Sequence, residues 1–121
     1  MTRSELKQIA EEAARAADCH LSYYRGKEED GQFLPELPEL PAMLYVMPET
    51  NGFFADGVVY TPLVQCDIYL YTREKDFARE DAVMDALKAA GIGYSRSEAY
   101  ITTEEMYEIR FSTEEFIRDE S

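Results

Sequence analysis

The stretch Leu63-Val64-Gln65-Cys66-Asp67-Ile68-Tyr69-Leu70-Tyr71 carries the clearest secondary-structure signal in the sequence. Apolar and polar side chains alternate along it, a period that is typical of a β-strand with two different faces. The apolar face, which we expect to point into the core, carries Val64, Cys66, Ile68 and Leu70. The polar face carries Gln65, Asp67, Tyr69 and Tyr71. We therefore predict a sheet built around this strand, with residues 58–60 leading into it.

A helix is predicted on each side of this strand in the sequence. Residues 3–18 begin with the capping-box spacing of Thr2 and Glu5, and small apolar side chains recur at helical intervals along one face. Residues 74–90 form the second helix, which Gly91 is expected to end in the left-handed conformation. Its expected core stripe contains Phe77, Val83, Met84, Leu87 and Ala90. Its expected solvent-facing residues are Arg73, Lys75, Arg79 and Glu80.

Three further segments predict strands and complete the fold. Residues 42–47 are a short apolar run bounded by prolines, and residues 94–102 and 106–112 flank a polar turn. The element order is helix, strand, strand, helix, strand, strand. We therefore predict an α+β fold, with an antiparallel or mixed sheet of about four strands and two helices packed on one face.

The composition indicates a folded, acidic protein. The 121 residues are expected to form a single domain, residues 1–121, with an acidic tail at 113–121 that contains a helical turn around Phe116 and Ile117. Acidic residues number 25 against 12 basic ones, and the net charge of −13 argues against tight phosphate binding and against docking on anionic membranes. The hydrophobic content of 45% is too high for a disordered acidic chain. Two cysteines and the lack of a signal-peptide core lead us to expect a reducing cytoplasm.

Two segments are expected to be loops. Residues 25–41 are rich in charge and glycine at first, and then carry proline at every third position from 35 to 41. This spacing favours an extended, exposed loop. The alternative is that residues 25–41 are a segment that docks on a partner. Residues 48–57 place Phe53 and Phe54 at or near the tip of a strand-to-strand connection, because they lie between the turn dipeptides Asn51-Gly52 and Asp56-Gly57.

The residue types that carry catalysis are few and poorly placed. His20 is the only histidine, and it follows Cys19 at the expected end of the first helix, where a capping role is expected. Cys66 is expected to be a small buried hydrophobe, so these three residues do not form a four-ligand zinc set. We therefore expect no catalytic residue, no cofactor site and no metal site, and a protein that is not an enzyme.

Aromatic residues point instead to a protein interface. Tyrosine is favoured where one side of a ring is apolar and its hydroxyl finds a hydrogen bond, as at interfaces. The candidate interface residues are Phe53, Phe54, Tyr60, Tyr69 and Tyr71. Two structural alternatives stay open: the tyrosines of the central strand cover the second face of the sheet, and the phenylalanines form a small cluster under their own loop.

Several short segments of the sequence resemble a known family. They are Phe53-Phe54-Ala55-Asp56-Gly57, Tyr60, Ile68-Tyr69-Leu70-Tyr71-Thr72, Lys75-Asp76, and Gly91-Ile92 with Tyr94. From about residue 41 to residue 111, the chain resembles the small tail-completion proteins of long-tailed bacteriophages and prophages, which include tail terminators and tail-to-head joining proteins.

The resemblance implies a small sheet with helices on one side and a hexameric ring without an active site. The implied partners are the tail tube protein and the head connector proteins, and DNA would pass through the ring without tight binding. The implied locations are the cytoplasm of the bacterial host during assembly and then the virion tail.

Two other functions stay open. An acidic regulatory or inhibitor protein of the DNA-mimic type would bind a basic partner through the acidic residues of segments 28–39 and 104–120. Its affinity would depend steeply on salt, whereas a tail-end protein would bind mainly through apolar contacts. An enzyme subunit without a recognisable motif is the third possibility.

Overall fold

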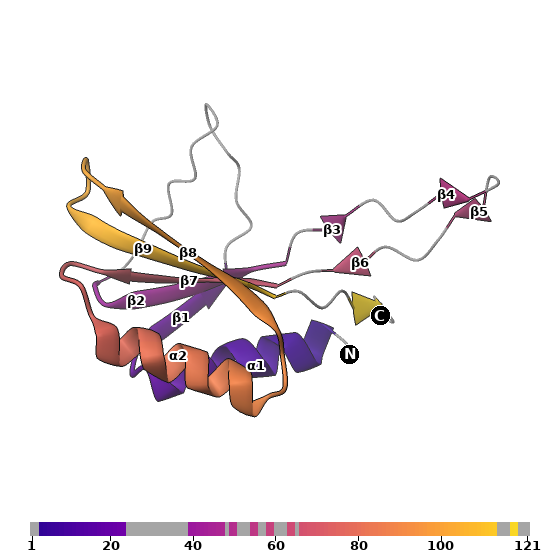
Figure 1. Cartoon of the computed structure of the whole chain (residues 1–121), viewed down its shortest axis with the longest axis horizontal. Helices are drawn as coiled ribbons and strands as arrows, with labels where there is room; N and C mark the ends of the chain where they lie inside the picture. The colour runs from indigo at the N-terminus through magenta and orange to yellow at the C-terminus, as the bar shows by residue number, and fades with distance from the viewer. Residues whose placement is uncertain are drawn as a thin grey trace.

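The computed structural model describes residues 3–23, 39–47, 49–50, 54–55, 58–59, 63–64, 66–113 and 117–118. These residues form two helices, a five-stranded mixed sheet, and short strands beyond one end of that sheet (Figure 1). The helices are α1 (Arg3–Ala16) and α2 (Phe77–Ala89), and both cover the same face of the sheet. The strands in spatial order are β1 (His20–Tyr23), β2 (Ala42–Val46), β7 (Asp67–Thr72), β9 (Met106–Thr113) and β8 (Tyr94–Ile101). The predicted α+β class is confirmed, with a fifth strand in the sheet.

The additional strand is β1, which lies at one edge of the sheet. It pairs with β2 in parallel, whereas the other neighbours in this sheet pair antiparallel. After α1 the chain turns back toward the sheet at Asp18, whose φ of 54° is left-handed. The expectation that Cys19 and His20 end a helix is therefore wrong, because His20 opens β1. Four residues are too few to give a clear strand period in the sequence.

The main core lies between the sheet and the two helices. Ala10 and Ala13 of α1 are 0% exposed, and their small side chains allow the helix to lie close to the strands. The alternation predicted for the central strand is confirmed for Cys66, Ile68 and Leu70, which all belong to this core. The other large side chains of this core include Leu6, Met43, Val83, Leu87, Ile109 and Phe111.

The face of the sheet opposite the helices, here called the open face, is also partly buried. Leu44, Tyr71 and Met106 form a second, smaller cluster, and Tyr69 packs against it. Tyr71 is 0% exposed, so the exposure expected for it is not observed. The reason is its position in the central strand β7, where β2 and β9 flank it on both sides.

The first turn of α2 differs from the prediction in its start and in its buried side chains. The helix begins at Phe77, because Asp76 is its N-cap and accepts a hydrogen bond from the Arg79 backbone N–H at 3.1 Å. Phe77, expected in the core, is 68% exposed, whereas Glu80, expected in solvent, is 3% exposed. Glu80 therefore lies on the buried side of the helix together with Val83 and Leu87.

The strands between residues 42 and 72 belong to one long hairpin. β2 is followed by β3 (Glu49–Thr50) and β4 (Phe54–Ala55), and β5 (Val58–Val59) and β6 (Leu63–Val64) precede β7. The pairs β2–β7, β3–β6 and β4–β5 share one antiparallel register, in which Ala42 faces Tyr71 and Ala55 faces Val58. We call residues 49–64 the arm. β4 and β5 lie at its far end, away from the five-stranded sheet (Figure 1).

The base of the arm has a third strand, β10 (Ile117–Arg118), which pairs antiparallel with β6. The helical turn expected around Phe116 and Ile117 is therefore wrong at Ile117, and Phe116 lies outside the described residues. The predicted strand that leads into residues 63–71 is found as β5, β6 and β7. Of the expected loop at 25–41, only residues 39–41 are described.

The C-terminus of α2 ends as predicted at Gly91. The Ile92 N–H donates to the Leu87 carbonyl at 3.1 Å, and the Gly91 N–H donates to the Lys88 carbonyl at 3.0 Å. These two bonds define a Schellman motif, which requires a left-handed residue, and Gly91 has a φ of 74°.

Gly91→Ala should lower the free energy of unfolding by about 1 kcal/mol, because a residue with a Cβ is strained in the left-handed conformation. Nothing lies within 4 Å of the position that a Cβ would take, so the backbone alone sets this cost. Urea unfolding measures it, and Gly93→Ala is the control because Gly93 is exposed and has no positive φ. An equal loss in both variants would contradict the prediction.

Candidate functional site

The predicted interface residues fall into two separate regions, the arm and the open face of the sheet. Phe54 lies in β4 near the far end of the arm, whereas Tyr69 and Tyr71 lie in β7 within the sheet (Figure 1). Phe53 and Tyr60 lie outside the described residues. The structure therefore does not bring Phe54 together with the two tyrosines.

The two tyrosines of β7 take part in a polar layer on the open face. The Tyr71 hydroxyl donates to Glu108 Oε2 at 2.8 Å, and its ring stacks on that of Tyr69 with centroids 6.2 Å apart. Arg110 Nη2 donates to Asp67 Oδ2 at 3.1 Å, which compensates a carboxylate whose side chain is only 5% exposed. These contacts favour the structural alternative for Tyr71, which covers the sheet. Tyr69 and Arg110 keep exposed surface on this face.

The far end of the arm is the more prominent candidate for contact with a partner. β4 and β5 pair with each other in a two-stranded sheet of their own, and the four residues of these strands are Phe54, Ala55, Val58 and Val59. A two-stranded hairpin is marginally stable by itself in water. An apolar pair of strands in this position is therefore well suited to pack against another protein surface.

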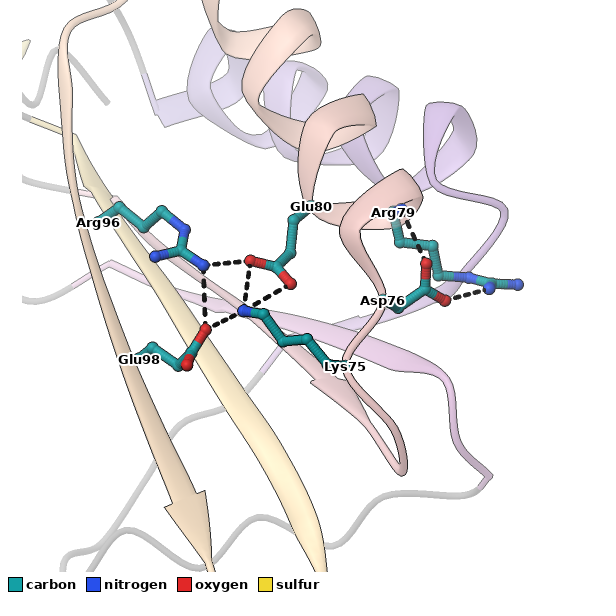
Figure 2. Close-up of polar contacts among 6 residues, drawn as sticks. All are labelled: Lys75, Asp76, Arg79, Glu80, Arg96 and Glu98. Atoms are coloured by element: carbon teal, nitrogen blue, oxygen red, sulfur yellow. Dashed lines mark hydrogen bonds and ion pairs between the residues drawn. The ribbon is translucent and has the colours of Figure 1, made fainter.

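A four-residue charge cluster joins α2 to the edge strand β8 (Figure 2). Lys75 Nζ lies 2.9 Å from Glu80 Oε2, Arg96 contacts the other oxygen of Glu80, and both cations also contact Glu98. The Glu80 side chain is 4% exposed, and a carboxylate this deeply buried requires compensation by cations or hydrogen-bond donors. The hydrogen bond from Lys75 holds the pKa of Glu98 below its usual range. The cluster holds the β8–β9 hairpin against the helical layer.

A second ion pair lies at the N-terminus of α2 (Figure 2). Arg79 Nη1 donates to Asp76 Oδ2 at 2.6 Å, while the other oxygen of Asp76 caps the helix. The hydrogen bond from the Arg79 side chain lowers the pKa of Asp76. This pair fixes the direction in which the chain enters α2.

Both cysteine thiols have a raised pKa in the folded protein. Burial raises the pKa of the Cys66 thiol to about 12, so this thiol stays protonated and is a poor nucleophile. Burial also raises the pKa of Cys19, whose Sγ donates to the Ala17 carbonyl at 3.5 Å. His20, on the exposed start of β1, is therefore not joined to an activated thiolate.

The charge cluster and the ion pair are the features of this region that sequence reasoning misses. Glu80 and Lys75 read as ordinary solvated charges on an amphipathic helix, and Arg96 and Glu98 read as polar positions of a strand. Arg96 and Glu98 are two positions apart, which places both side chains on the same face of β8. This spacing is the one feature of the sequence that indicates the cluster. The helix phase that turns Glu80 inward depends on the N-cap at Asp76.

Glu80→Gln should lower the free energy of unfolding by about 2 kcal/mol, because Lys75 and Arg96 lose their charge-assisted hydrogen bonds to the buried carboxylate that they share. Asp81→Asn is the matched control, since Asp81 is the next residue of the same helix and is exposed. Urea unfolding monitored by circular dichroism gives both values. Equal effects would show that the cluster contributes little to stability.

Asp76 should give the fold part of its acid sensitivity. Because its pKa is lowered in the folded protein, ionised Asp76 stabilises the fold above its ordinary value of 3.8, and this contribution is lost as the pH falls through the folded-state pKa. Asp76→Asn keeps a cap acceptor but cannot ionise. The difference in unfolding free energy between wild type and this variant should therefore shrink from about pH 6 to about pH 2.5. A difference that does not change with pH would contradict this assignment.

Three further findings concern metal binding, membrane crossing and similarity to known proteins. Among the described residues, no three His, Cys, Asp or Glu side chains come together as a group that could hold a metal ion. No helix in the same residues has the length and apolar character needed to cross a membrane. Compared with models of protein families and with curated proteins, the chain matches none.

Proposed function

We propose that this protein is a tail-completion protein of a long-tailed phage or prophage, which ends the tail tube or joins the tail to the head. It acts without catalysis, by assembling into a ring, for which a hexamer is proposed. The sequence segments Phe53–Gly57 and Ile68–Thr72 support this proposal through their resemblance to that family. The α+β fold with both helices on one face of the sheet also supports it.

The single observation that carries the proposal is the arm. Its described strand pairs share the register of the central hairpin, and β4 and β5, whose four residues are apolar, lie away from the five-stranded sheet (Figure 1). The arm is suited to cross a subunit boundary, and in a ring the same contact repeats at every boundary.

The proposed partners are further copies of this chain, the tail tube protein and the head connector proteins. The net charge of −13 is compatible with a ring through which DNA slides, because an acidic lumen does not hold phosphates. The proposed locations are the cytoplasm of a bacterial host during assembly and the virion tail afterwards.

The double variant Phe53→Ser with Phe54→Ser should stay folded but lose ring formation or docking on tails. Burying one phenylalanine at an interface contributes roughly 1.5–3 kcal/mol, and a ring contains several such contacts. Phe77→Ser is the matched control, because Phe77 is 68% exposed on α2 and its loss removes a phenyl ring far from the arm. Thermal unfolding, light scattering and negative-stain counts of capped tails report the outcome.

Three outcomes would contradict the proposal. Unfolding of the double variant would show that the phenylalanines belong to the core. Normal assembly of the double variant would show that the arm is not needed for assembly. A wild-type protein that ignores tail tubes and connector rings but binds a nucleic-acid-binding protein, with steep loss of affinity in salt, would favour the acidic inhibitor instead.

A further inference from the structure

The edge strand β8 is long, exposed and paired on one side only within the described residues. It runs over eight residues, Tyr94–Ile101, and the six side chains from Ser95 to Tyr100 are exposed. Its outer edge presents backbone donors and acceptors, which can pair with another strand. The occupant that fits this edge can be identified from the order of its side chains.

We propose that β8 pairs antiparallel with β8 of a second copy of this chain, about a two-fold axis at Ser97. The sequence Tyr-Ser-Arg-Ser-Glu-Ala-Tyr at 94–100 is complementary to its own reverse. In this register Arg96 of each copy faces Glu98 of the other, Tyr94 faces Tyr100, and the two Ser97 residues face each other. Opposite charges and aromatic pairs directly across two strands are stabilising.

Other registers of the same strand lose this match. A two-fold axis at Arg96 or at Glu98 would place like charges opposite each other, which is destabilising. The charged residues that discourage general pairing at an exposed edge thus select one particular partner and register. An axis at Ser97, perpendicular to the sheet, also keeps the helices of both copies on the same side and joins two five-stranded sheets into one.

The charge cluster leaves room for this contact. The side chains of Arg96 and Glu98 remain 33% and 36% exposed although both bind within their own chain. A guanidinium carries five N–H donors and a carboxylate about four acceptor positions, so both groups can take a further partner. Across the two-fold axis, the cluster of Lys75, Glu80, Arg96 and Glu98 would continue into its counterpart with alternating charge.

Ser97→Glu and Ser97→Lys test the contact in the full-length protein. Each variant places like charges opposite each other at the axis. Within one chain, position 97 lies opposite the exposed Arg110, which the acidic substitution would attract and the basic one would repel. We expect wild type to be a dimer by sedimentation and light scattering at high micromolar concentration. Each variant should raise the dissociation constant roughly tenfold or more, and an equimolar mixture of the two should recover dimers. Ser4→Glu, on the exposed surface of α1, is the control for added charge, and circular dichroism checks the folding of each variant.

Disulfide trapping tests the register independently of charge. S97C should crosslink to itself under mild oxidation, because directly opposed positions have adjacent Cβ atoms. S95C should not, since the two positions 95 would lie about 13 Å apart along the strands. A wild type that stays monomeric, a mixture that fails to recover dimers, or S95C crosslinking as well as S97C would overturn the proposal.

The β8 contact and the proposed function can fail separately. The β8 contact uses no residue of the arm, so Phe53→Ser with Phe54→Ser should leave the free dimer intact. If Ser97→Glu has no effect on mass while the arm variant abolishes a larger ring, the β8 contact is wrong and the tail-completion proposal stands. If the Ser97 variants dissociate the dimer but the wild-type protein never caps tails, the β8 contact stands and the tail-completion proposal is wrong.

Discussion

The central strand β7 must bury both of its faces, and most of the architecture follows from this constraint. Five of its six residues are buried, and the partly exposed one is Tyr69. On one face Ile68 and Leu70 need a thick apolar cover, which α1 and α2 supply. On the other face a thinner layer is enough, because the Tyr71 hydroxyl donates a hydrogen bond to Glu108 and so needs no apolar cover. Among the six residues of this strand, Tyr69 is the one that keeps exposed surface.

The same strand determines where the arm begins. β7 is the returning half of a hairpin whose outgoing half starts as β2, and the register of this pair continues without a shift to Ala55 and Val58. The described strand pairs of the arm therefore keep the register that β2 and β7 set. The charge cluster holds the β8 edge of the sheet, where Glu80 of α2 contacts Arg96 of β8. Both proposed contact surfaces, the arm and the β8 edge, are thus extensions of one well-packed sheet.

The fold could be predicted from the sequence where a pattern is local and repeated. Alternation over residues 63–71 gives β7, alanine spacing gives α1, and Gly91 gives the end of α2. β1 could not be found, because four residues carry no period and its pairing with β2 bridges a gap of many residues. The inward position of Glu80 depends on one cap residue, Asp76, and on cations from two other segments. The burial of Tyr71 follows from the strand order, which the sequence does not reveal.

The central claim is that the protein works by assembly and that the arm makes the contact. Hydrogen exchange of the full chain, measured with and without tail tubes, tests this claim most directly, because it reports backbone protection segment by segment. We expect peptides that cover the arm, residues 49–64, to gain protection when tubes are added, while β7 and β9 stay protected in both states. Binding that leaves exchange in the arm unchanged, or no binding at all, would contradict the account.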